Sequence, residues 1–205
     1  DVNSAAEKCK DKIGDKWESF ANFWRTTQLE YTWLRSLMER HKDFWQVTED
    51  SLDKSMKAFN IDISMKDELL NLYKVLSPYK EVPETLKTLK EKKFKLAILS
   101  NGTPSLLNEL VKSNNLDNLF DDIFSIEEVG VYKPSSKVYD IPIKKYQIEK
   151  SEVAFLSANT WDVSGGGNYG YQSIWVNRNN NIFDNLDYEP KNQIKNLKDL
   201  LPKLN

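Results

Sequence analysis

The chain has 205 residues, 40% of them hydrophobic, so it can bury a core and form one domain or one domain with an insertion. Its 29 Lys and Arg residues against 31 Asp and Glu leave a formal net charge of −2, without the basic excess that nucleic acid or anionic lipid attracts. No run approaches the roughly 18 apolar residues that span a membrane, and the single Cys9 cannot form an internal disulfide. These totals favour a cytoplasmic protein that binds a small molecule.

The first 77 residues have the spacing of packed amphipathic helices. Large apolar side chains recur there at intervals of three and four, and we expect this stripe to be core packing between helices. Arg25 stands out as a cation among the aromatic residues. We therefore predict a helical domain at 1–77 and a second domain at 78–205. The stripe comprises Trp17, Phe20, Phe23, Trp24, Leu29, Tyr31, Trp33, Leu34, Leu37 and Met38.

After Pro78 and Pro83 the pattern changes to short apolar runs that alternate with helical segments. A short apolar run between turn signals is typical of a buried parallel strand. Alternation of strand and helix predicts right-handed crossovers and a doubly wound, mostly parallel, Rossmann-like α/β sheet. The strands are expected at 95–99, 152–156 and 173–176, and the helices at 105–113 and 136–146.

Ligands of open α/β sheets bind beyond the carboxyl ends of the strands, so the residues that follow each strand are candidates. The first strand leads into Ser100-Asn101-Gly102-Thr103-Pro104. A hydroxyl, an amide and free backbone N–H groups at a helix start can bind an anion. The same residue types also serve as ordinary helix caps and turns, and both interpretations remain open.

A second candidate is Lys133, which precedes Pro134 in the segment Gly130–Tyr139. Pro134 restricts the backbone on both sides of the peptide bond, so the ammonium group is carried at a junction of loop and helix. A lysine held in this way can neutralise a buried carboxylate. The alternative is an ordinary solvated lysine.

The third and most specific candidate follows the strand at 152–156. Ser157, Asn159 and Asp162 leave the strand end in close succession, and Gly165-Gly166-Gly167 would let another part of the backbone approach closely. Three converging polar groups have little use in a purely structural strand end. We therefore expect them to surround one crevice.

In this order, each after the expected element, the three motifs resemble motifs two, three and four of the haloacid dehalogenase superfamily. The segment Phe23–Leu34 and the Ser-x-Asn-x-Trp-Asp form of the last motif resemble the L-2-haloacid dehalogenases in particular. The resemblance covers essentially the whole chain. It implies a Rossmann-like core with a helical cap, and hydrolysis of short L-2-haloacids to 2-hydroxy acids through an aspartyl ester.

The resemblance also implies roles for single residues. Arg25 would take the departing halide, and Lys133 would keep the nucleophilic aspartate ionised. Ser157, Asn159 and Asp162 would position and activate water. Substrate contacts would come from Ser100 and Asn101 on its carboxylate, from Tyr139 lining the pocket beside the lysine, and from Leu29, Phe44 and Trp161 around its carbon chain.

No metal cofactor is expected. Phosphatases of the same superfamily use Mg²⁺ with paired acidic residues in the last motif, where this chain has Asn159 in one place and Asp162 alone. A Mg²⁺-dependent phosphatase of small metabolites remains the alternative enzyme. The aromatic surface of 4–77 exceeds what one small cap needs, and the family resemblance agrees, so a homodimer through the cap is expected.

Three departures from the family pattern bear on these expectations. Thr26 stands where the family commonly has glutamine, and Pro142 should kink or interrupt the helix at 136–146. The family's nucleophile motif, Asp-x-Tyr-Gly-Thr, does not occur in the sequence. Asp1-Val2-Asn3-Ser4 instead resembles the stretch that follows this motif.

The missing motif makes the printed chain a doubtful catalyst. We expect it to lack the central first strand and to be inactive. The sheet should show a gap beside the strands at 95–99 and 152–156, or have that gap filled by another chain or a further segment. Asp1 is rejected as the nucleophile because no apolar strand precedes it, and an intact sheet with Asp1 against Lys133 and Asp162 would overturn that rejection. A non-catalytic scaffold that binds a partner remains the alternative outside enzymes.

Overall fold

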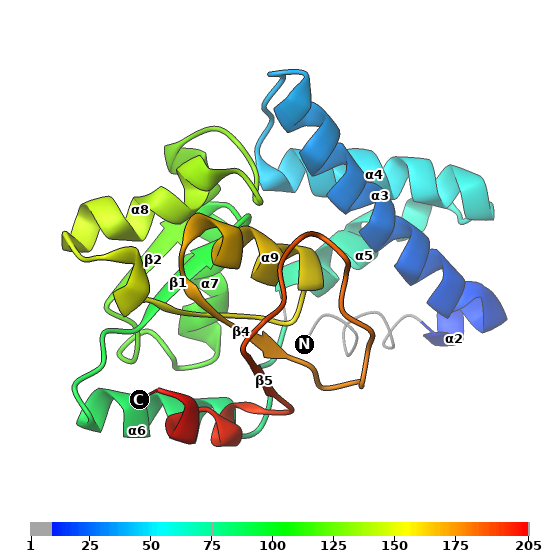
Figure 1. Ribbon diagram of the computed structural model, residues 1–205. Coiled ribbons are helices and arrows are strands. Elements are labelled where there is room, and N and C mark those ends of the chain that lie inside the picture. The colour runs from blue at the N-terminus through cyan, green and yellow to red at the C-terminus, as the bar shows by residue number, and fades with distance from the viewer. Residues whose placement is uncertain (1–9, 75, 205) are drawn as a thin grey trace. The chain divides into compact units, whose positions relative to one another are not determined.

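The structure is a computed structural model that describes residues 10–74 and 76–204. An all-helical first part is followed by helices that alternate with strands (Figure 1). The α-helices are α2 (Lys10–Ile13), α3 (Trp17–Leu37), α4 (Phe44–Phe59), α5 (Lys66–Asn71), α6 (Val82–Glu91), α7 (Pro104–Ser113), α8 (Ser136–Tyr146) and α9 (Thr160–Tyr169). The strands are β1 (Ala97–Ser100), β2 (Asp122–Ser125), β3 (Ala154–Ser157), β4 (Gln172–Val176) and β5 (Asn192–Ile194).

The chain divides into two compact units. The first consists of residues 1–79 and 100–118, and the second of 80–99 and 119–205. The predicted boundary at residue 77 lies close to the first break, but the sequence did not indicate that 100–118 belongs with the helical unit. The two-domain division at 77 stays a prediction.

In the first unit, α3 and α4 pack on each other. Asp43 caps α4 by accepting the Gln46 N–H at 2.8 Å, which satisfies one of the free donors of the first turn. The Trp24 indole N–H donates to the Thr48 carbonyl at 3.2 Å, so α3 is tied to α4 by a polar contact inside an apolar core. That core consists of Phe20, Trp24, Leu52, Met56, Leu69 and Leu70.

The apolar stripe of α3 is core only along part of its length. Phe20 is 2% exposed, whereas Leu34, Leu37 and Met38 near the end of the helix are 49%, 80% and 59% exposed. The expectation that the stripe is simply core is therefore wrong for the last turn. The last contact of α3 with α4 that holds this end is the ion pair of the Arg35 guanidinium with Asp50 at 2.6 Å, and these three apolar side chains remain exposed among the residues that the structure describes.

In the second unit, β3, β4 and β5 form a parallel sheet in that order. Ala154 pairs with Gln172 and Ser157 with Trp175, and α9 makes the crossover from β3 to β4. This confirms the α/β class with parallel strands. The sequence did not predict β2 and β5, because one has only two adjacent apolar residues and the other is Asn-Gln-Ile.

The strands form two separate sheets in the described part of the chain. β1 pairs with β2, and no ladder joins this pair to β3. The predicted gap between these strands stays a prediction, because residues 1–9 lie outside the described part of the chain. Ala97 is exposed and Ile98 is half-buried, although strands inside a parallel sheet are normally covered on both faces. Asp1, the alternative nucleophile, lies outside the described residues.

Two further features of the second unit concern its helices. Figure 1 shows α6 beside the C-terminal turns, where Arg178 binds Glu81 at 2.7 Å and Leu89 packs with Leu200. α8 runs without interruption through the buried Pro142. A single missing N–H removes only one backbone donor, so the helix continues on both sides of the proline.

Candidate functional site

The junction of β3 and α9 collects the three polar residues of the last motif. Ser157 ends β3, Asn159 is the residue before α9, and Asp162 lies in the first turn of that helix. The Ser157 hydroxyl accepts the Asn159 N–H at 3.2 Å, which shapes the turn. A carboxylate in the first turn is favoured by the helix dipole, so the location of Asp162 follows from where the helix begins.

Lys133 and Asp162 form a buried ion pair. The Lys133 ammonium lies 3.2 Å from Asp162 Oδ2, and the two side chains are 6% and 7% exposed. The alternative interpretation of Lys133 as a solvated lysine is therefore wrong. Its ammonium also lies 4.9 Å from the centre of the Phe155 ring. Two charges removed from water in this way hold each other in place, since either one alone would be costly to bury.

Tyr139 completes the contacts of the carboxylate. Its hydroxyl donates to Asp162 Oδ1 at 2.8 Å, opposite the oxygen that Lys133 binds. Burial, reinforced by the negative charge of Asp162, raises the pKa of Tyr139 far above its usual value, so the hydroxyl remains a donor. The side chain is fully buried and points at Asp162. Its expected role as a pocket wall stays a prediction.

Gly165 makes room for this arrangement. A Cβ at that position would lie 2.5 Å from the Tyr139 hydroxyl and 2.7 Å from Pro134 Cβ. Only a residue without a side chain lets α9 approach the loop of Lys133 and helix α8 so closely. The run of three glycines was the signal in the sequence for this close approach.

The turn after β1 has its own local structure in the first unit. Thr103 caps α7 by accepting the Leu106 N–H at 3.4 Å. The Ser100 hydroxyl accepts the Gly102 N–H at 3.1 Å. The capping interpretation thus applies to Thr103, and Ser100 with Asn101 precedes the cap as half-buried residues. Binding of an anion by these two residues stays a prediction.

The remaining candidates are half-buried side chains. Arg25 and Leu29 lie four residues apart on α3 and share one face of it, and Phe44 begins α4. These three belong to the first unit, as do Ser100 and Asn101, whereas Trp161 lies on α9 in the second. The structure brings together Lys133, Tyr139, Ser157, Asn159 and Asp162, and the wider grouping stays a prediction.

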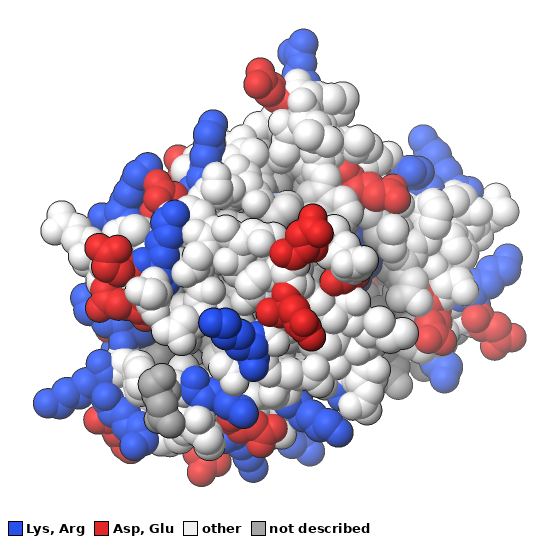
Figure 2. Space-filling view, in the orientation of Figure 1, with Lys and Arg blue, Asp and Glu red and all other residues white. Residues whose placement is uncertain are grey.

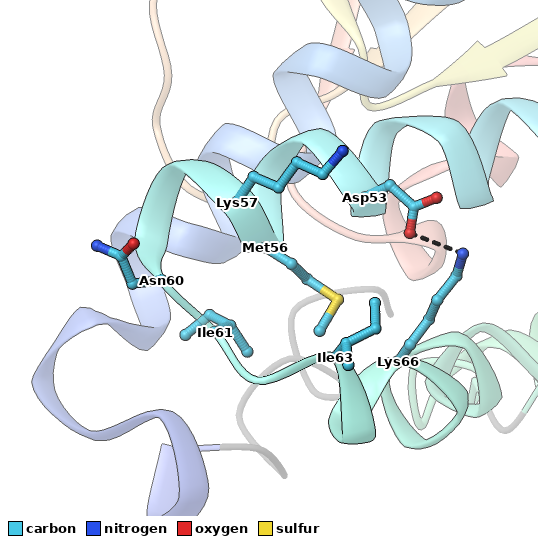
Figure 3. A pocket seen from close by; sticks show the side chains of 7 residues that line it. All are labelled: Asp53, Met56, Lys57, Asn60, Ile61, Ile63 and Lys66. Carbon is cyan, nitrogen blue, oxygen red and sulfur yellow. Dashed lines mark ion pairs between the residues drawn. The ribbon is translucent and has the colours of Figure 1, made fainter.

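A surface pocket of the first unit contains none of the predicted site residues. Figure 3 shows Lys57, Asn60 and Ile61 on one side of it and Ile63 on the other, with the Asp53–Lys66 ion pair of 2.7 Å at one end. The lysines make it polar, while Met56 at its floor belongs to the helical core.

The surface charges and the potential metal ligands are those of residues 10–74 and 76–204, the part of the chain that the structure describes. Basic and acidic side chains are interspersed on the face shown in Figure 2. In that described part, no group of three or more His, Cys, Asp or Glu could hold a metal ion. Every helix there is too short or too polar to cross a membrane.

Known proteins resemble this chain over almost its whole length. A profile of the family described as haloacid dehalogenase-like hydrolase matches residues 19–176. The (S)-2-haloacid dehalogenase of Pseudomonas sp. (strain YL) is 36% identical over 200 residues, which cover 97% of this chain and 86% of that protein. A dehalogenase of solved structure is 34% identical with a TM-score of 0.96, over 100% of this chain and 91% of that one. The L-2-haloacid dehalogenase of Xanthobacter autotrophicus, solved with chloropropionic acid covalently bound, is 30% identical with a TM-score of 0.91, over 100% and 92%.

Proposed function

This chain belongs to the haloacid dehalogenase-like hydrolase family, and we propose that the protein hydrolyses short L-2-haloacids to 2-hydroxy acids. The observation that carries the proposal is the buried contact of Lys133 and Tyr139 with the two carboxylate oxygens of Asp162. It lies at the carboxyl end of a parallel strand, in a chain 36% identical to an (S)-2-haloacid dehalogenase. A buried, fully engaged carboxylate at such a place is typical of a catalytic site.

The proposed reaction has two steps that share one aspartate, the nucleophile of the family's first motif. A carboxylate oxygen of that aspartate bonds to the α-carbon while the carbon–halogen bond breaks, and the electron pair leaves with the halide. Water then attacks the carbonyl carbon of the ester and gives up a proton, the bond between that carbon and the substrate oxygen breaks, and the departing oxygen takes up a proton to become the hydroxyl of the product. The 2-hydroxy acid departs and the aspartate is regenerated. Division of one displacement into two easier steps is the gain of covalent catalysis.

In this mechanism the residues around Asp162 serve the second step. Asp162, held by Lys133 and Tyr139, would take the proton of the attacking water, and Ser157 with Asn159 would orient that water. Lys133 would also lie beside the nucleophile and favour its ionised form. Proton transfer requires a carboxylate held in one orientation, and the two contacts at 3.2 Å and 2.8 Å supply it.

The substrate proposed is a small monoanion, and positive side chains supply the charge that it needs. Arg25 would accept the halide, and Ser100 with Asn101 would bind the carboxylate. A halide leaves without a proton, and one carboxylate can be met by cationic and polar side chains alone. We therefore propose that the reaction uses no metal cofactor.

Halide release is the direct test of this function. We expect the full-length gene product to release chloride from L-2-chloropropionate, and to do so equally with and without EDTA. The D enantiomer is the matched control, because inversion at the α-carbon requires attack from one side only. Activity confined to a phosphate ester in the presence of Mg²⁺ would contradict the proposal and favour the phosphatase alternative.

We also propose that the protein is a homodimer through the exposed end of α3. Leu34, Leu37 and Met38 form an apolar patch there that water covers in the single chain. A Leu37→Asp substitution should convert the dimer to a monomer, because a charge at the centre of such a contact has no partner. Light scattering over a range of concentrations measures the change.

The control for the dimer is Ile63→Asp. Ile63 is similarly exposed, at 67%, and lies outside this patch. The Ile63→Asp variant should have the same molar mass by light scattering as the wild-type dimer. A wild-type protein that stays monomeric at high concentration, or a Leu37→Asp variant that stays dimeric, would contradict an interface at this end of α3.

A further inference from the structure

Tyr171 makes a buried contact with the candidate site, and the proposed mechanism gives this residue no role so far. It lies just before β4, and its side chain is 4% exposed. Its hydroxyl donates to the backbone carbonyl of Tyr139, a residue inside α8. A carbonyl has two lone pairs, so it can take this bond in addition to its bond within the helix.

Tyr139, which accepts this hydrogen bond from Tyr171, is itself bound to the carboxylate of Asp162. The hydroxyl of Tyr139 donates to Asp162 Oδ1 at 2.8 Å. The rings of Tyr139 and Tyr171 meet edge to face, with centres 6.1 Å apart, and Phe155 packs against both. Burial raises the pKa of Tyr171 above its usual value, so its hydroxyl is a permanent donor. The chain of contacts runs from Tyr171 through Tyr139 to Asp162.

We propose that Tyr171 is a positioning residue, which holds Tyr139, and through it Asp162, in the orientation needed to take a proton from water. The proposal rests on the proposed function for its chemical meaning. Nothing in the sequence singled this residue out, since Tyr-Gly-Tyr before a strand has no distinguishing pattern. The hydroxyl of Tyr171 donates to the Tyr139 backbone carbonyl, so its proposed action on Asp162 is through Tyr139.

A Tyr171→Phe variant tests the proposal, because it keeps the ring contacts and removes one hydroxyl. Loss of one hydrogen bond of this kind should slow hydrolysis of the ester by roughly three- to tenfold, and KM should fall together with kcat because only the second step is slowed. The first turnover, which forms the ester, should keep its rate and its burst of halide. The ester should then accumulate and be visible by mass spectrometry of the intact protein.

The matched control is Tyr146→Phe. Tyr146 ends α8, and its hydroxyl donates to Asp122 at 2.7 Å, away from Asp162. This variant loses a hydroxyl from the same helix and should keep the wild-type rate. A smaller halide burst in Tyr171→Phe with an unchanged rate per active site would show a merely structural role and overturn the proposal. Equal slowing in the two variants would do the same.

A second readout does not depend on activity. The Lys133 ammonium lies 4.9 Å from the centre of the Phe155 ring, so the ring current shifts the NMR signal of its ε-methylene. Tyr171→Phe should move this signal, and Tyr146→Phe should not. If the full-length gene product releases no halide, the proposed function fails while this measurement still decides the positioning. An unmoved Lys133 signal in Tyr171→Phe would overturn it.

Discussion

A Lys133→Met variant is expected to lose about 3–5 kcal/mol of unfolding free energy together with its dehalogenase activity. The substitution keeps most of the apolar stem and removes the ammonium, which leaves Asp162 buried at 7% exposure without its cation. An uncompensated charge in such a place costs far more than the pair contributes. Urea denaturation of the variant and the wild-type protein measures the difference.

Two further variants show whether the loss of stability comes from the buried charge and whether it can be separated from the loss of activity. Lys144 also forms an ion pair, with Asp140 at 2.6 Å, but its side chain is 79% exposed. Lys144→Met should therefore lower the free energy of unfolding by at most about 0.5 kcal/mol. In Lys133→Met with Asp162→Asn, both partners are neutral and the amide oxygen still accepts from Tyr139. This double variant should regain most of the lost stability and stay inactive. Equal losses for Lys133→Met and Lys144→Met would contradict the importance of burial.

The 205-residue chain that begins at Asp1 is expected to release no measurable halide. The ester step needs a nucleophilic aspartate, and the printed residues contain no Asp-x-Tyr-Gly-Thr. Loss of a covalent nucleophile commonly lowers the rate on the order of 10⁴-fold or more.

A chimera tests whether the missing nucleophile is the reason for the expected inactivity. The N-terminal segment of the Pseudomonas sp. (strain YL) relative, fused ahead of Asp1, should restore halide release if it carries the motif. The same fusion with asparagine in place of the motif's aspartate is the control and should be silent. Halide release by the 205-residue chain, abolished by Asp1→Asn, would contradict the prediction and make Asp1 the nucleophile.

The sequence alone was enough to predict the local structure of this protein. Helix α8 has the predicted bounds, and β1, β3 and β4 lie within two residues of the predicted runs, because apolar periodicity is a local property. The Ser157–Asp162 motif was recognisable for the same reason, since strand end and first helical turn are adjacent in the chain. β2 and β5 were missed because their pairing partners, and not their own composition, make them strands.

Only the tertiary structure showed which residues from different helices and strands contact one another and which of them are buried. Lys133 and Asp162 are 29 residues apart, and no local pattern states that the lysine is buried against that carboxylate. The same holds for the Tyr139 hydroxyl and for Tyr171, 32 residues away, whose contact depends on the crossing of α8 and the start of β4. It also holds for the exposed end of α3, which has the apolar residues of a core. Burial depends on which elements meet, and the spacing of residues along a chain carries that information only for neighbours on one element.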